Sequence, residues 1–295
     1  MELARVLSTN GGVAETSYAK NSFIQQKVIH LTRPIREEAI TSLYCNKLPT
    51  SLAIADMGCS SGPNTLNVVS EIIKTVENLC RELHQTSPEY KIFLNDLPGN
   101  DFNSIFRSLD SFKEKLLDEM ETSIGPCYFS GVPGSFYSRL FPNRSLHFVH
   151  SSYSLHWLSK VPEGVNNNKG NIYIGSTSPS NVVKAYYDQF QRDFNLFLKC
   201  RAEEVIDGGC MVLTILGRKI KIHPAKRLPV SESLNDNGYN ITQCMRSVAE
   251  PLLVSHFGEV IIEEVFSRYQ QILADRMSKE KTKFINVTVL LTRKA

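Results

Sequence analysis

Residues 52–64 read Leu52-Ala53-Ile54-Ala55-Asp56-Met57-Gly58-Cys59-Ser60-Ser61-Gly62-Pro63-Asn64. The run from Leu52 to Ala55 is short and apolar and is bounded by turn-forming residues, which is typical of a buried parallel strand. Gly58 and Gly62 allow a tight turn after the strand, and Pro63 favours the first turn of a helix. Because ligands of open α/β sheets bind outside the carboxyl ends of the strands, this segment predicts a site for a nucleotide-like cofactor.

The glycine spacing and two acidic residues indicate which cofactor binds. The spacing Gly58-x-x-x-Gly62 differs from the G-x-G-x-x-G pattern of dinucleotide-binding folds, which disfavours a nicotinamide dehydrogenase. A carboxylate at Asp56 would repel a pyrophosphate, whereas it suits the α-ammonium group of S-adenosylmethionine. A second acidic strand end, Asp96, lies where adjacent α/β units bind ribose hydroxyls. Together the two carboxylates predict an S-adenosylmethionine site; the alternative is that each only caps a helix.

The bulk properties of the chain exclude several classes of function. The 295 residues are enough for one large α/β domain or two small ones. A formal net charge of +3 is too small to indicate binding to nucleic acid or to an acidic membrane. We expect a cytoplasmic protein, since no apolar run could span a bilayer and no signal-peptide core is present at the start. The seven cysteines form no C-x-x-C pair and no zinc-binding pattern, which indicates reduced thiols.

Strand and helix patterns alternate along the chain after an N-terminal arm. Apolar runs predict strands over residues 52–56, 90–96, 127–132, 146–151, 209–216 and 284–292. Helical periodicity is found over residues 21–45, 64–84, 101–117, 186–206 and 248–275. This alternation predicts a doubly wound, mostly parallel α/β sheet, and the strand–helix–strand ending indicates an antiparallel strand at its edge.

Two further segments carry aromatic residues at predicted strand ends. In residues 131–137, Phe136 could cover one face of an adenine ring; the alternative is an ordinary turn with a core aromatic residue. In residues 147–158, a helix capped by a serine would place three rings on one face. These rings belong to Tyr153, His156 and Trp157. They would suit a flat ligand that carries hydrogen-bond acceptors, whereas the alternative is a core-packed tryptophan beside a satisfied histidine.

Six segments carry motifs long enough to compare with known families. They are Gly11-Gly12, Thr16-Ser17-Tyr18-Ala19-Lys20-Asn21-Ser22, Asp56 to Asn64, Phe93-Leu94-Asn95-Asp96-Leu97-Pro98-Gly99-Asn100-Asp101-Phe102-Asn103, Pro133-Gly134-Ser135-Phe136-Tyr137, and His150-Ser151-Ser152-Tyr153-Ser154-Leu155-His156-Trp157-Leu158. Together these segments resemble the plant SABATH methyltransferases, most closely the salicylate and benzoate carboxyl methyltransferases. The resemblance implies a Rossmann-like fold with a helical cap, S-adenosylmethionine as methyl donor, S-adenosylhomocysteine as product, and a small aromatic carboxylic acid as acceptor.

The resemblance also implies roles for individual residues. The cofactor contacts that it implies are Tyr18, Cys59, Asn64, Asp96, Leu97, Ser135 and Phe136, with Asp56 beside them. The implied substrate contacts are Gln25, Tyr153, His156, Trp157 and Phe284. Gln25 and Trp157 would hold the carboxylate, and histidine at position 156 goes with benzoate rather than salicylate preference within the family. Asn10 is a departure, because relatives carry a lysine there.

A carboxylate acceptor needs no general base. Benzoate and salicylate are ionised at neutral pH, as model carboxyl pKa values near ~4 indicate. The enzyme therefore only has to hold one carboxylate oxygen in line with the sulfonium methyl group, and such orientation can supply roughly 7–11 kcal/mol. We accordingly expect a carboxyl methyltransferase that forms methyl esters of benzoate, salicylate or both.

Between residues 219 and 236 the chain departs from the family pattern, because relatives carry a much longer helical cap there. We expect one methyltransferase domain over residues 1–295: an arm and helix over the active site (1–50), a core (51–219 and 239–295), and a cap remnant (220–238). A shortened cap would open the pocket to water, so the alternative function is an inactive relative that binds S-adenosylmethionine or a partner protein. No metal is expected, because the partners of Asn168 would fall in the missing cap. We also expect a homodimer.

Overall fold

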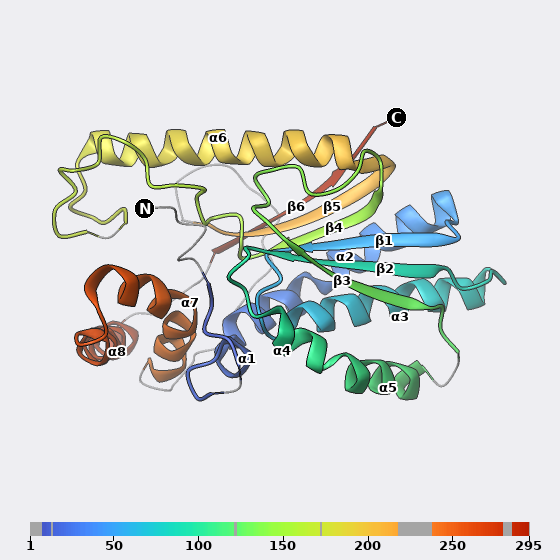
Figure 1. Cartoon of the computed structure of the whole chain (residues 1–295), viewed down its shortest axis with the longest axis horizontal. Coiled ribbons are helices and arrows are strands. Elements are labelled where there is room, and N and C mark those ends of the chain that lie inside the picture. Colours follow the sequence, from blue (N-terminus) through green and yellow to red (C-terminus); the bar gives the residue numbers. More distant parts are fainter. Residues whose placement is uncertain are drawn as a thin grey trace.

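The computed structural model describes residues 8–12, 14–120, 123–171, 173–217, 238–279 and 285–294. Within these residues one sheet has the strand order β3-β2-β1-β4-β5-β6 (Figure 1). The strands are β1 (Ser51–Met57), β2 (Glu89–Asp96), β3 (Cys127–Pro133), β4 (Leu146–Ser152), β5 (Val205–Gly217) and β6 (Ile285–Thr292). Neighbouring strands are parallel except β5 and β6, which are antiparallel. The predicted mostly parallel sheet with an antiparallel edge strand is confirmed.

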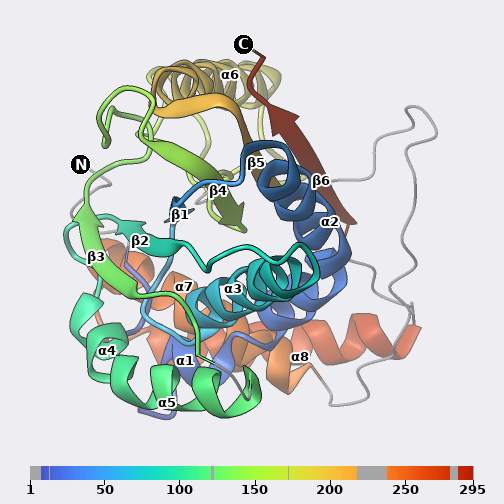
Figure 2. The same cartoon turned by 90° about the vertical axis from the view of Figure 1, so that its right-hand side faces the viewer.

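Helices bury apolar side chains on both faces of the sheet. Successive residues of a strand point to opposite faces, so Ile54 joins the core on one face and Ala55 joins the core on the other. The first face is covered by α2 (Phe23–Lys47) and α3 (Asn64–Glu82), and the second by α6 (Ser180–Glu204), as Figure 2 shows. Helices on both faces are the feature that defines a doubly wound fold, as predicted.

The strand order fixes where a ligand can bind. From β1 the chain continues to β2 and β3 on one side, and it then returns to place β4 on the other side of β1. The order of the strands thus reverses between β1 and β4. In a parallel sheet, such a reversal leaves a crevice at the carboxyl ends of the two strands. The loops that follow β1, β2 and β4 therefore meet at this point.

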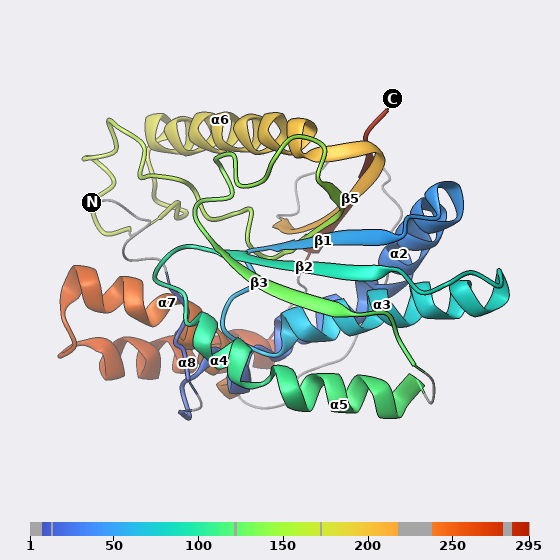
Figure 3. The ribbon, with the colours of Figure 1, turned by 45° about the vertical axis from the view of Figure 1, so that its right-hand side comes forward.

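The predicted helix over residues 248–275 is wrong in its extent. The structure has two helices here, α7 (Tyr239–Phe257) and α8 (Ile262–Lys279), which pack against each other in Figure 3. Helix α7 also contacts α1 (Tyr18–Asn21). Gly258 ends α7 with a positive φ of 80°, a conformation that glycine adopts without strain and that stops an α-helix. Apolar spacing on both sides of the break produced a single helical pattern.

The helix predicted over residues 101–117 is also divided. It consists of α4 (Phe102–Arg107) and α5 (Leu109–Met120), which meet at Ser108. The Asp101 carboxylate accepts a hydrogen bond from Ser104 N at 3.1 Å and so caps the start of α4. After the break, Phe112 of α5 packs edge-on against Phe129 of the edge strand β3, with ring centroids 5.8 Å apart.

The cap remnant predicted at residues 220–238 lies almost wholly outside the described residues, as does Phe284. Between β5 and α7 the structure describes nothing from 218 to 237. In the part of the chain that is described, no helix is both long and apolar enough to cross a membrane.

Candidate active site

A cleft at the carboxyl ends of β1, β2 and β4 collects most of the predicted site residues. It encloses about 900 Å³, its open mouth included. Its walls come from the N-terminal arm, α1, α2, the loops after β1 to β4, and α7. The lining includes Tyr18, Gln25, Asp96, Leu97, Ser135, Phe136, Tyr153 and Trp157 among the predicted residues. These predicted residues come from four segments far apart in the sequence, 18–25, 96–97, 135–136 and 153–157, which therefore form one site.

The glycine turn after β1 brings the predicted motifs into contact. Gly58 has a φ of 79°, and both Gly58 N and Cys59 N donate to Asn95 O at 2.9 Å. A side chain at position 58 would place its Cβ 2.2 Å from Ser154 Oγ, so only glycine fits beside the loop after β4. At Gly62 the same Cβ would lie 2.9 Å from the Tyr18 ring. The glycines thus allow close packing of the loops that line the cleft.

Asp96 ends β2 and lies in the cleft wall. Its Oδ2 accepts from Ser60 N at 2.7 Å and its Oδ1 accepts from Leu97 N at 2.8 Å. Burial raises the pKa of Asp96 to about 6 and outweighs these two hydrogen bonds, which act in the opposite direction. A carboxylate oxygen has more than one lone pair, so Asp96 retains acceptor capacity for hydroxyl donors in the cleft.

The other predicted carboxylate, Asp56, is not among the lining residues. It is buried in β1, where its Oδ1 lies 2.8 Å from Nδ1 of His150 on β4, its partner in register. The His150 Nε2 is buried without a hydrogen-bond partner among the described residues. Among the described residues, His150 is the only polar contact shown for the Asp56 carboxylate. That Asp56 faces the ammonium group of the cofactor therefore stays a prediction.

Cys59 and Asn64 lie behind the cleft wall. The Cys59 thiol is buried, and burial raises its pKa well above the usual range. Asn64 Nδ2 donates to Tyr18 Oη at 3.2 Å, while Asn64 Oδ1 is buried with no partner in the described ranges. Asn10 donates to Glu250 on α7 at 2.7 Å and does not line the cleft.

The loop after β4 forms a turn and not the predicted helix. Tyr153 has a φ of 58°, and the Trp157 N–H donates to Ser154 O at 3.0 Å. The predicted side-by-side arrangement of rings is nevertheless present, with centroids 6.0 Å apart for Tyr153 and His156 and 5.7 Å apart for His156 and Trp157. A left-handed residue at position 153 stops helix propagation, since non-glycine residues adopt it singly and not in helices.

Neutral polar side chains lie at and beside the Trp157 end of the cleft, which Gln25 and Trp157 line and His156 does not. Burial lowers the pKa of His156 to about 4, so its imidazole is neutral at physiological pH, and its Nδ1 has no partner in the part of the chain that is described. Gln25 Oε1 accepts from the Cys244 thiol at 3.1 Å, which leaves the amide N–H groups of Gln25 as its donors. Trp157 contributes an indole N–H as its only polar side-chain group.

Several lining residues were absent from the sequence prediction. They are Ser8, Thr9, Ser60, Asn100, Tyr137, Ser152, Ser154, Leu158, Ser159 and Val248, together with Gly58. Most lie next to predicted residues in the quoted motifs, but Thr9 and Val248 reach the cleft only through tertiary packing. Thr9 Oγ1, for instance, is hydrogen-bonded to Ser60 Oγ at 2.7 Å. Among the described residues no group of three His, Cys, Asp or Glu side chains could hold a metal ion.

Comparison with known proteins gives the family. A family model described as SAM (S-adenosylmethionine) dependent carboxyl methyltransferase matches residues 4–236 and 222–294. The chain is 48% identical over 367 aligned positions to a salicylate carboxymethyltransferase of Clarkia breweri, with 100% of both chains covered. It is 46% identical to a benzoic acid/salicylic acid carboxyl methyltransferase of Petunia hybrida, with 99% of each covered.

A solved structure agrees with these sequence relatives. The structure of loganic acid methyltransferase with SAH (S-adenosylhomocysteine) superimposes with a TM-score of 0.83 at 31% identity, covering 97% of this chain and 99% of that one. The alignment of 367 positions with the Clarkia protein exceeds the 295 residues of this chain, so that relative has residues with no counterpart here. The shortened cap is consistent with this difference. The chain belongs to the family of SAM-dependent carboxyl methyltransferases.

Proposed function

We propose that this enzyme methylates the carboxylate of benzoate, salicylate or both, with donor and acceptor held at opposite ends of the cleft. The observation that carries the proposal is that one cleft joins the acidic end of β2 at Asp96 to the neutral donors Gln25 and Trp157. The Clarkia and Petunia relatives, whose names state salicylate and benzoate, support the choice of acid. We further propose a homodimer located in the cytoplasm.

The described residues fit an adenosyl cofactor at the Asp96 end. The partly buried carboxylate of Asp96 suits the two ribose hydroxyls, because a charged acceptor forms strong hydrogen bonds with hydroxyl donors. The half-buried ring of Phe136 offers an aromatic surface for adenine, and Ser135 adds a hydroxyl beside it. We assign Asn64 and Asp56 to the ammonium group of the cofactor; Asn64 Oδ1 is an acceptor without a partner among the described residues, buried behind the cleft wall. We assign Tyr18, Cys59 and Leu97 to the same end.

The acceptor end binds an anion and holds it still. Bound S-adenosylmethionine supplies a methyl group on a positively charged sulfur. Gln25 and Trp157 donate to the carboxylate of the acid, which is already ionised, so no side chain has to remove a proton. Tyr153 and the neutral His156 enclose the aromatic ring, with Phe284 proposed as a further wall. Rate enhancement then comes from orientation, which can supply roughly 7–11 kcal/mol.

A methyl-transfer assay tests the proposal directly. Purified enzyme is incubated with S-adenosylmethionine and benzoate, salicylate or jasmonate, and the methyl esters are quantified together with S-adenosylhomocysteine. We expect kcat/KM to be higher for the two aromatic acids than for jasmonate, a bulkier acid without an aromatic ring. Binding of S-adenosylhomocysteine in calorimetry without any ester formation would instead support the inactive relative.

Replacement of His156 by methionine should change the preference between the two aromatic acids. The neutral imidazole can hydrogen-bond the acid, whereas a thioether mainly packs against its ring. One neutral hydrogen bond contributes about 1 kcal/mol, so we expect the salicylate-to-benzoate ratio of kcat/KM to rise by roughly fivefold in His156→Met. Steady-state kinetics with both acids measures this ratio. A ratio equal to that of the wild type would contradict the assignment of His156 to the acceptor pocket.

A further inference from the structure

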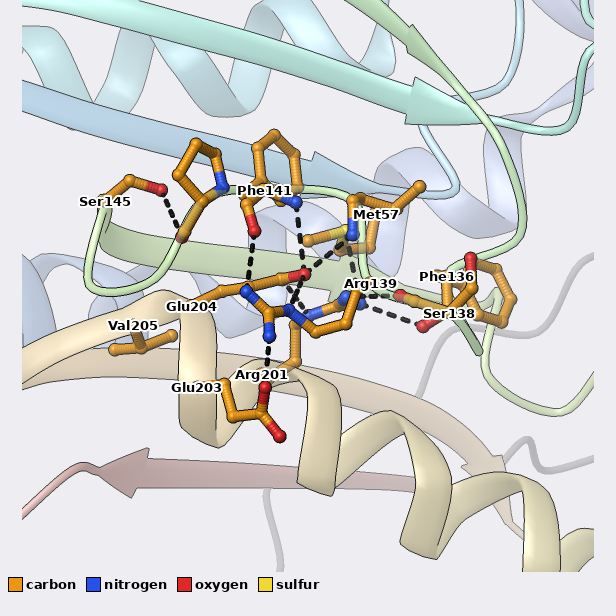
Figure 4. Close-up of polar contacts among 12 residues, drawn as sticks. Met57, Phe136, Ser138, Arg139, Phe141, Ser145, Arg201, Glu203, Glu204 and Val205 are labelled. Atoms are coloured by element: carbon orange, nitrogen blue, oxygen red, sulfur yellow. Dashed lines mark hydrogen bonds and ion pairs between the residues drawn. The ribbon is translucent and has the colours of Figure 1, made fainter.

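A buried ion pair on α6 holds the loop that carries Phe136 into the cleft. Arg201 and Glu204 are both fully buried, and Arg201 Nε lies 2.7 Å from Glu204 Oε2. The guanidinium group of Arg201 also donates to Phe136 O at 2.8 Å and to Ser138 O at 2.7 Å, as Figure 4 shows. Two carbonyl groups of the 134–141 loop thus depend on one arginine.

Glu204 holds the other end of the same loop. Its Oε1 accepts from Leu140 N at 2.7 Å. It also accepts from Phe141 N at 3.1 Å, as Figure 4 shows. Arg139 Nε also donates to this oxygen at 3.2 Å. Residues 134–141 belong to no strand or helix, so their main-chain groups are not paired within regular secondary structure. The ion pair therefore provides hydrogen-bond partners for main-chain donors and acceptors at both ends of the loop.

The contacts continue from the loop to both ends of the cleft. The Arg201 guanidinium lies over the Phe197 ring at 5.2 Å, and that ring packs edge-on against Phe136 at 6.3 Å. Tyr137, the next residue of the loop, donates from its hydroxyl to Trp157 O at 2.8 Å. The 134–141 loop is thus tied to the proposed adenine surface and to the proposed acceptor site.

Buried ion pairs contribute little net stability, because desolvation of both charges offsets their attraction. A pair that forms four hydrogen bonds to the main chain of one loop has a different use: it fixes the loop in one conformation. We propose that Arg201 and Glu204 are positioning residues for cofactor binding, which act through the 134–141 loop. This inference rests on the proposed placement of the cofactor at Ser135 and Phe136.

The test compares Arg201→Lys and Glu204→Gln with the wild-type enzyme. Lysine keeps the charge but has no planar fork, so it cannot hold both carbonyl oxygens and Glu204 at once. We expect the KM for S-adenosylmethionine and the Kd for S-adenosylhomocysteine to rise about tenfold in each variant, which corresponds to about 1.4 kcal/mol. The kcat at saturating cofactor should fall by less than about threefold, because bound cofactor and the loop order each other.

The matched control is Arg36→Lys. Arg36 is also buried and donates to Ile29 O at 2.7 Å and to Thr32 Oγ1 at 2.7 Å, while it pairs with Glu71. None of these partners lines the cleft, so this variant should bind cofactor as the wild type does. Equal loss of cofactor affinity in the control, or unchanged affinity in both α6 variants, would overturn the proposal.

A further variant separates failure of this inference from failure of the proposed function. Phe136→Ala removes the proposed adenine surface and leaves the main-chain contacts of Arg201 in place. Weaker binding of S-adenosylhomocysteine in Phe136→Ala, with normal binding in Arg201→Lys, would reject the positioning role alone. Normal binding in Phe136→Ala would reject the placement of the cofactor itself.

Discussion

Replacement of Asp96 by asparagine should weaken S-adenosylhomocysteine binding by at least about a hundredfold. Hydrogen bonds to a charged group contribute about 1.5–3 kcal/mol each, and the proposal gives Asp96 two ribose hydroxyls. Ser60 N and Leu97 N each donate to one oxygen of Asp96. The amide nitrogen of asparagine would replace one of these acceptor oxygens, so one of the two hydrogen bonds would be lost. Isothermal titration calorimetry measures the change directly.

Cofactor affinity should also depend on pH through Asp96. Its pKa is raised to about 6 by burial, so the group is protonated below that value and can no longer accept from both hydroxyls. At pH 5, one unit below this pKa, we expect affinity about tenfold lower than at pH 8, and Asp96→Asn should lack this dependence. The free energy of unfolding of the free protein should depend on pH in the opposite direction to cofactor affinity. Asp96 contributes stability below about pH 4, and this contribution is lost as pH rises through about 6.

Glu77→Gln is the control for this prediction. Glu77 is a buried carboxylate that accepts from Tyr90 Oη at 2.7 Å, Ser87 Oγ at 2.6 Å and Gly125 N at 3.2 Å, away from the cleft. Its replacement should lower thermal stability and leave the S-adenosylhomocysteine Kd and its pH dependence unchanged. If Asp96→Asn behaved like Glu77→Gln, Asp96 would have a structural role and no cofactor role.

Replacement of Gln25 by alanine should reduce kcat/KM for benzoate by about a hundredfold while cofactor affinity changes by less than about twofold. The amide would hold the carboxylate in line with the methyl group, and misplacement of a reacting group by about 1 Å can cost about a hundredfold. Trp157→Phe keeps an aromatic ring and removes only the indole N–H, so a loss of about tenfold is expected. Initial rates and calorimetry on the same preparations give both quantities.

Gln26→Ala serves as the control for Gln25→Ala. Gln26 is the next residue of α2, is exposed, and donates to Ser22 Oγ at 3.3 Å. Both variants remove a glutamine side chain from α2, but only Gln25 lines the cleft. A fall in cofactor affinity that matched the fall in kcat/KM would show that the division between donor and acceptor ends is wrong.

The mostly parallel sheet could be predicted because its strands are short apolar runs that alternate with helical periodicity, whereas the order of the strands was not predicted. The glycine turn was equally clear, since a positive φ at position 58 and the contact with Ser154 demand a residue without a side chain. The break at Gly258 was missed because apolar spacing is similar in α7 and α8. The spacing of apolar residues gives no sign of a helix break that depends on the backbone conformation of one residue, Gly258.

Side-chain direction at strand ends was harder to predict. Asp56 and Asp96 both follow apolar strand patterns in the sequence, yet only Asp96 lines the cleft. The Asp56 carboxylate instead forms a hydrogen bond with His150 on the neighbouring strand. Arg201 and Glu204 gave no signal at all, since charged residues near the end of an amphipathic helix normally face solvent. Contacts between distant segments decide such positions, and no local pattern contains them.

Trp157 is the one tryptophan of the whole chain. Its ring lies beside that of His156, its carbonyl is held by Tyr137, and it lines the cleft. The intrinsic tryptophan fluorescence of this enzyme therefore comes from a single point in the cleft, at the proposed acceptor end. Changes in emission can report the arrival of an acid without any label, and the neutral state of His156 keeps an imidazolium quencher away from the indole at physiological pH.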